Sequence, residues 1–228
     1  MIFYTILFSL DKPEKNWYFY MMMMLYKSLV ATESVGPADK FFVVCDKATA
    51  EFGRRLPSLR RVLWVEVAPV DSVKNGMLYK YIFRPKVDEV VLYLDCDFLA
   101  TKKVSLDLPP DTFAYLQEGR PDDSNYCGAG GSLGASAGIF GFRYGPRCKQ
   151  ILDEIGLRTM NCSKGFYTLD QPHYNAVLAE ATNRVRMEPW FVSFNGHGDP
   201  RAALINCAGI PGDGPFHFQK MMDFFIRS

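Results

Sequence analysis

The sequence predicts an α/β protein with a mostly parallel central sheet flanked by helices, and three observations support that class. Short apolar runs of strand length alternate with helix-like stretches through the first half of the chain. Strands separated by helical segments are joined by crossover connections, which make them parallel. The composition agrees, because 48% of the 228 residues are hydrophobic and 22% are charged, as in an ordinary globular protein.

The first half contains four expected strands and three expected helices. We expect the strands at residues 2–10, 41–45, 62–67 and 90–94. We expect the helices at residues 15–30, 48–56 and 76–83. An open parallel sheet binds ligands outside the carboxyl ends of its strands. The residues that follow Leu94 are therefore expected at a functional position.

The second half has more glycine and longer connections. Expected strands at 113–116 and 138–142 flank a glycine-rich stretch, and expected helices follow at 146–155 and 171–180. The tail from 194 to 215 is rich in Gly, Pro, Asn and Asp, and is predicted to be loop. The sequence contains no repeat and no low-complexity linker, so we expect one domain over residues 1–228.

Net charge and cysteine spacing restrict the kinds of binding partner and of cellular compartment that we expect. The net charge is +1, with 26 basic and 25 acidic residues, which argues against nucleic acid as a partner. Any anionic ligand must then be held by a local site. The six cysteines show no CxxC pair and no zinc-ligand spacing, which favours a reducing compartment.

Two apolar stretches near the N-terminus have the composition of targeting or membrane segments. The first, up to Leu10, has no basic region before it and no small-residue cleavage site after it. The second, residues 17–26, is too short to span a bilayer. We expect no signal peptide, no membrane span and a cytoplasmic location.

The strongest chemical signal is a pair of aspartates directly after the fourth apolar strand. Asp95 and Asp97 are two residues apart, and in an extended chain that spacing places both carboxylates on one face. Carboxylate oxygens favour hard cations such as Mg²⁺ and Mn²⁺. Such an ion could bridge to a diphosphate and neutralise its charge as it departs. The alternative is a pair of solvated aspartates at the end of a strand.

The run Val91–Leu99 resembles the Asp-x-Asp segment of GT-A glycosyltransferases, especially family 8, which includes glycogenin and bacterial lipopolysaccharide galactosyltransferases. Further segments resemble this family in the same order along the chain. They are Phe8–Asp11, Leu25–Leu29, Ser136–Phe140, Leu169–Gln171 with Asn175, and Phe216–Phe218. The resemblance covers most of the chain.

The resemblance implies a Rossmann-like GT-A fold and a metal-dependent transfer reaction. A hexose would move from a nucleotide-diphosphate sugar, with a UDP-sugar expected, to a hydroxyl of a glycan or glycoprotein acceptor, with retention of configuration. The activity would serve carbohydrate biosynthesis. Residues 1–100 would form the nucleotide-binding half and residues 101–228 the acceptor-side half. Mn²⁺ or Mg²⁺ would be bound by Asp95, Asp97 and His217, with His197 as a second candidate for the histidine ligand.

The resemblance also assigns donor-binding and catalytic residues. Those expected to bind the donor are Ser9, Leu10, Asp11, Lys80, Arg84, Asp95, Ser136 and Lys220. Asp170 and Gln171 are expected near the reacting carbon, where a carboxylate or carbonyl can stabilise positive charge on the sugar. For Lys80 and Arg84, which lie one helical turn apart, a solvated helix face is the alternative.

Two departures from the family leave the donor sugar open. Ser136 stands where the family usually has an asparagine that contacts the sugar. The family's Gly-x-x-Lys-Pro-Trp loop is replaced by a run containing Lys220. A catalytically inactive nucleotide-sugar-binding domain is therefore one alternative. A haloacid-dehalogenase-like phosphatase is another, although Leu99 stands where that chemistry wants Thr or Val, and a sugar nucleotidyltransferase would need a glycine-rich N-terminal signature that is missing.

Overall fold

The fold is that of a computed structural model, which describes residues 1–9, 12–71, 73–85, 87–118, 133–162, 170–194, 201–207 and 218–223. The chain divides into two compact units. Unit 1 comprises Met1–Val70, Leu94–Ser105 and Trp190–Ser228, and unit 2 comprises Asp71–Tyr93 and Leu106–Pro189.

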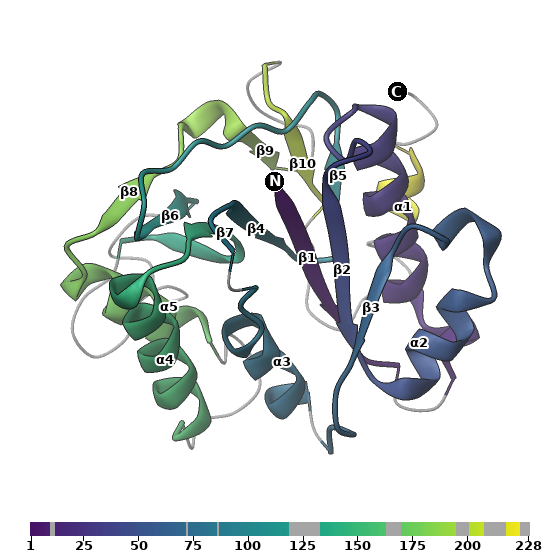
Figure 1. The fold of residues 1–228 in the computed structure, drawn as a ribbon, viewed down its shortest axis with the longest axis horizontal. Coiled ribbons are helices and arrows are strands. Elements are labelled where there is room, and N and C mark those ends of the chain that lie inside the picture. Colours follow the sequence, from purple (N-terminus) through teal and green to yellow (C-terminus); the bar gives the residue numbers. More distant parts are fainter. Residues whose placement is uncertain are drawn as a thin grey trace. The chain divides into compact units, whose positions relative to one another are not determined.

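Unit 1 is built on three parallel strands, β1 (Ile2–Leu7), β2 (Lys40–Cys45) and β3 (Leu63–Glu66). They lie side by side in the order β3-β2-β1 (Figure 1). Leu7 pairs with Cys45, and Cys45 with Glu66, so the three strands end at one level. The strand–helix alternation that the sequence predicts is thus confirmed, and the carboxyl ends of the strands form one edge.

The helices α1 (Trp17–Ala31) and α2 (Lys47–Arg54) belong to this unit, with short 3₁₀ turns η1 (Pro13–Lys15) and η2 (Pro57–Leu59). The face of α1 that packs inward carries a cluster of methionines, and Met21, Met22 and Met24 are buried.

Among the described residues, no helix is long and apolar enough to cross a membrane.

A second, three-stranded sheet in unit 1 was not predicted. Its order is β5 (Phe98–Ala100), β10 (Leu204–Asn206), β9 (Val192–Phe194). The prediction that the tail from 194 to 215 is loop is therefore wrong at residues 204–206. A three-residue strand is too short to show a clear alternation of apolar and polar residues among glycines and prolines. In addition, β10 pairs with a segment about a hundred residues earlier in the chain. A further turn, η3 (Pro189–Phe191), precedes β9.

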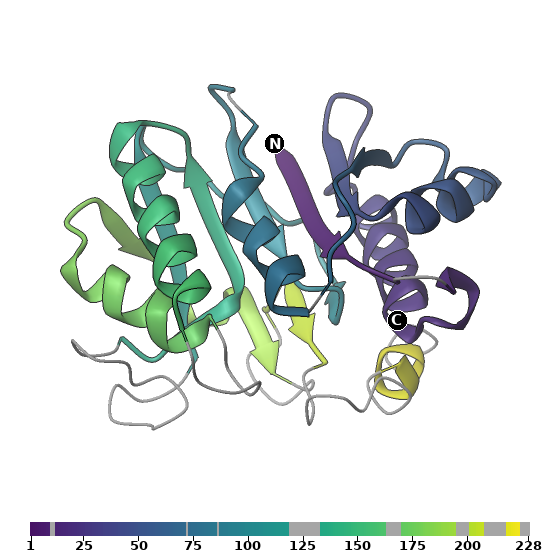
Figure 2. The same ribbon diagram turned by 90° about the horizontal axis from the view of Figure 1, so that it is seen from below.

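Unit 2 contains the strands β4 (Val90–Leu94), β7 (Ala135–Arg143), β6 (Thr112–Gln117) and β8 (Arg184–Arg186), in that spatial order. β6 runs antiparallel to β7 and parallel to β8. Helix α4 (Pro146–Met160) contacts both α3 (Val73–Ile82) and α5 (Gln171–Glu180), and Figure 2 shows α4 and α5 side by side in green. The chain is therefore α/β with a mostly parallel sheet, as predicted.

The N-terminus of α4 is capped from a distance by Asp111. Its two carboxylate oxygens accept hydrogen bonds from the backbone N–H groups of Arg147 (3.2 Å) and Cys148 (2.9 Å). Asp111 itself has φ 54°, a left-handed conformation that Asp and Asn tolerate better than other non-glycine residues. A Cβ on Gly145 would lie 2.5 Å from the Asp111 side chain, so the close approach of this cap requires glycine there.

We expect Asp111→Ala to lower the free energy of unfolding by about 2–3 kcal/mol, because it removes a helix cap and places alanine in a left-handed conformation. Asp111→Asn keeps one acceptor oxygen, and asparagine tolerates the left-handed conformation. This variant should therefore lower the free energy of unfolding by less than about 1 kcal/mol. Chemical denaturation of both variants measures the difference. Equal losses would show that the cap contributes nothing specific.

Candidate functional site

The end of β1 is held by the N-caps of two helices. The backbone N–H of Ser9 donates to Oδ2 of Asp46 (2.8 Å), whose Oδ1 caps α2 through Thr49 N (2.9 Å). The side-chain amide of Asn16, which caps α1 through Tyr18 N, donates to the Ser9 hydroxyl (3.0 Å). Ser9, predicted to bind the donor, is therefore fixed in place at the carboxyl edge of unit 1.

The aspartate pair follows β4, as predicted, but not in extended chain. The strand ends at Leu94, and Cys96 and Asp97 form a turn before β5 begins at Phe98. The Cys96 sulfur lies 3.4 Å from the Thr5 hydroxyl and donates to the carbonyl of Ile6 (3.5 Å). Cys96 is thus buried against β1, whereas Asp95 and Asp97 are both half-exposed. The expectation of an extended chain at this point is wrong, because the chain leaves one sheet here to join another.

Cys207 lies beside Asp97, and no sequence motif points to it. Its backbone N–H donates to the carbonyl oxygen of Asp97 (2.8 Å). Burial raises the pKa of the Cys207 thiol to about 12; the negative charge of Asp97 raises it further, and the positive charge of Lys220 opposes the shift. The charges of Asp97 and Lys220 therefore act in opposite directions on this buried thiol.

Several predicted residues lie outside the part of the chain that the structure describes. These are Leu10, Asp11, His197, His217 and the glycine-rich stretch at 128–131. Among the described residues no group of three or more His, Cys, Asp or Glu side chains could hold a metal ion. Asp95 and Asp97 supply two carboxylates, the donor type that suits Mn²⁺ and Mg²⁺. A third protein ligand from His217 stays a prediction.

In unit 2, Lys80 and Asp170 form a buried ion pair. The Lys80 ammonium lies 3.2 Å from Oδ2 of Asp170, and each side chain is 5% exposed. The same oxygen accepts a hydrogen bond from the Tyr81 hydroxyl at 2.8 Å. The ammonium also lies over the ring of Tyr93, 5.3 Å from its centre. Two sequence predictions, a donor-binding lysine and a catalytic aspartate, thus meet in one cluster that spans α3 and the start of α5.

Arg84, the other predicted basic residue of this region, lies just beyond the end of α3 and contacts α4. Its guanidinium pairs with Asp153 at 2.7 Å and donates to the carbonyl of Tyr81 at 2.6 Å. Burial alone would raise the pKa of Asp153, but hydrogen bonds from Lys149 and Arg84 bring it below its usual value. The expectation that Arg84 binds the donor stays a prediction.

The first turn of α5 is tied to the start of β7. Oε1 of Gln171 accepts from the backbone N–H of Ala137 at 3.1 Å. The Asn175 amide makes four hydrogen bonds: it accepts from Leu133 and Ala135 and donates to the carbonyls of Ala135 and Gln171. Ser136, predicted to contact the donor sugar, lies within this segment of β7 and is 4% exposed. Gln171 and Asn175 therefore hold the backbone on both sides of Ser136, whereas Asp170 contacts Lys80 and Tyr81.

Comparison with solved structures identifies proteins of the same fold. The glycosyltransferase GlyE of Streptococcus pneumoniae TIGR4 matches with a TM-score of 0.60 at 14% identity, over 99% of this chain and 63% of GlyE. Its apo form matches with a TM-score of 0.63 at 13% identity. Mouse xyloside xylosyltransferase 1 in its apo form gives 0.59 at 11% identity, over 92% of this chain and 98% of that protein.

These likenesses show that the chain has a glycosyltransferase fold. The chain spans about 63% of the length of GlyE. No protein-family model matches the sequence, and no curated protein matches it. Membership of family 8, which the sequence motifs suggest, therefore stays a prediction.

We expect Lys80→Met to lower the free energy of unfolding by about 3–5 kcal/mol, because it leaves the buried Asp170 carboxylate without its counter-charge. The double variant Lys80→Met with Asp170→Asn should lose less, since the amide is neutral and its oxygen still accepts from Tyr81. Denaturation of the two variants tests this. A double variant that is no more stable than the single one would contradict a charge-pair role.

Proposed function

We propose that the chain is a metal-dependent glycosyltransferase that moves a hexose from a nucleotide-diphosphate sugar to an acceptor hydroxyl. A UDP-sugar is the expected donor, a glycan or glycoprotein the expected acceptor, and retention the expected outcome. One observation carries the proposal: an aspartate pair follows β4 in a chain whose fold matches two glycosyltransferases.

The residues of unit 1 fit the binding of a diphosphate. Asp95 and Asp97 would hold Mn²⁺ or Mg²⁺, with His217 as the third protein ligand, and such an ion supplies charge neutralisation for a departing diphosphate. Lys220 would add a positive charge that a diphosphate can pair with. Ser9 is fixed by the caps of α1 and α2 and would contact the nucleotide base.

In unit 2, the candidates for stabilising positive charge on the sugar lie at the start of α5, where Asp170 is buried and paired with Lys80. Lys80 and Tyr81 both contact Oδ2 of Asp170, so the carboxylate is held in one orientation. The Gln171 carbonyl uses one lone pair for Ala137, and its second lone pair can face a developing oxocarbenium ion. Asp170 and Gln171 would act at the reacting carbon, and Ser136 would contact the donor sugar.

We expect Asp97→Asn to reduce turnover of the preferred UDP-sugar by about 10²-fold or more at saturating Mn²⁺, because an amide is a poorer metal ligand than a carboxylate. Release of UDP by hydrolysis or transfer is the readout, so the acceptor need not be known. Asp107→Asn removes an equally charged, exposed side chain and serves as the control. Full activity of the Asp97 variant would remove the basis for the metal assignment.

We expect UDP with Mn²⁺ to raise the melting temperature, and excess EDTA to abolish that increase. At a ligand concentration one hundred times Kd, the stabilisation is about 2.7 kcal/mol, which for a chain of this size is a shift of about 5–10 °C. Differential scanning fluorimetry across several nucleotides and sugars would also rank the donors. An increase of equal size in EDTA would argue against an ion between protein and diphosphate.

A chain that binds the donor but never turns it over would be an inactive nucleotide-sugar-binding domain.

A further inference from the structure

A basic concavity of about 400 Å³ lies in unit 1, between α1 and the segment around η2. Its apolar wall consists of the Tyr26, Val30, Ala31 and Pro57 side chains. Among the described residues, its polar lining consists of Ser58 and three cations, Lys27, Arg60 and Arg61, with no acidic residue. None of these residues belongs to the candidate site described above. We refer to this concavity as the Arg60 pocket.

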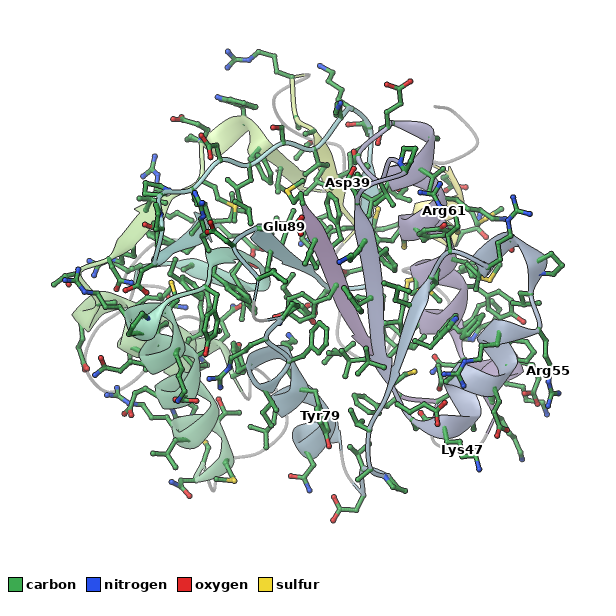
Figure 3. The ribbon with its side chains drawn as sticks, viewed as in Figure 1. Asp39, Lys47, Arg55, Arg61, Tyr79 and Glu89 are labelled. Atoms are coloured by element: carbon green, nitrogen blue, oxygen red, sulfur yellow. The ribbon has the colours of Figure 1, made fainter. Side chains whose placement is uncertain are left out.

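The backbone holds the two arginines of the Arg60 pocket firmly. They stand between Leu59 and Val62, which are 1% and 5% exposed and anchor the segment in the core. The N–H of Val62 donates to the carbonyl of Leu59 at 2.9 Å. The Arg61 guanidinium donates to the carbonyl of Gly36 at 2.6 Å, and this hydrogen bond fixes one side of the planar guanidinium group. Figure 3 labels Arg61 on this segment of unit 1.

The three cations of the Arg60 pocket differ from Arg54 and Lys47, two paired basic residues of unit 1. Arg54 pairs with Glu66, and Lys47 pairs with Glu51 at 3.7 Å. Within the described part of the chain, no carboxylate forms an ion pair with Lys27, Arg60 or Arg61.

Two acids lie three residues from Gly36: Asp39 accepts from the N-terminal amine of Met1 at 2.8 Å, and the exposed Glu33 is not among the described residues that line the pocket. The chain as a whole is nearly neutral, so three positive charges without an acid in one concavity form a local excess.

We propose that the Arg60 pocket binds a phosphate-type anion. Guanidinium groups bind phosphate oxygens through paired N–H donors, and Lys27 and the Ser58 hydroxyl add further donors. The phosphate could belong to a soluble phosphorylated molecule or to a lipid headgroup, and the apolar wall of Tyr26 and Val30 would contact the part of the ligand that carries it. This inference does not depend on the proposed transfer activity.

The test uses the full chain in EDTA, so that no metal-bridged nucleotide site contributes. One arm replaces chloride by inorganic phosphate at constant ionic strength and follows backbone amide shifts by NMR. The other measures co-sedimentation with vesicles containing phosphatidylserine. We expect saturable binding in at least one arm. The variant Lys27→Gln/Arg60→Gln/Arg61→Gln should weaken it at least tenfold.

A matched control removes three charges from exposed positions of unit 1 outside the pocket: Lys40→Gln/Lys47→Gln/Arg55→Gln (Figure 3 labels Lys47 and Arg55 near α2). Phosphate binding without vesicle binding identifies a soluble ligand. Vesicle binding that phosphate competes away identifies a headgroup. Binding in neither arm, or an equal loss in the control variant, would overturn the proposal.

Discussion

A parallel strand that ends leaves backbone N–H and C=O groups without partners from the ladder, and buried groups of this kind must be satisfied elsewhere. In unit 1 this requirement is met by the residues that also form the candidate site. The N–H of Ser9 is taken by Asp46, and the carbonyl of Asp97 by the N–H of Cys207. One of these two bonds uses a side chain, that of Asp46, and the other joins two backbone groups.

The buried pair of Lys80 and Asp170 serves unit 2 in a similar way. Desolvating two charges is costly, and such a pair is tolerated only when additional hydrogen bonds satisfy its remaining atoms. The Tyr81 hydroxyl and the Tyr93 ring provide these contacts. Because Lys80 lies on α3 and Asp170 immediately precedes α5, the pair connects α3 to the start of α5, and Gln171 connects α5 to β7.

The sequence predicted the elements whose signal is local. β1, β2, β4 and the first two helices follow from apolar runs with polar breaks, and the aspartate pair follows from its place after β4. It could not reveal partners that lie far apart in the chain. Lys80 meets an aspartate 90 residues later, Cys207 meets Asp97 across β10, and the turn at Cys96 exists only because β5 joins a second sheet. Non-local pairing, rather than composition, determines these features.

The methionines of α1 have a consequence for the chemical durability of the protein. Met21 and Met22 are fully buried, so peroxide reaches their sulfur atoms only when unit 1 opens. Once oxidised, each thioether becomes a polar sulfoxide that a close-packed interior rejects. An opening that would otherwise be reversible then becomes permanent. Under oxidative stress the rate of this damage is therefore set by how often this helix is exposed, and enzymatic reduction of the sulfoxide would reverse it.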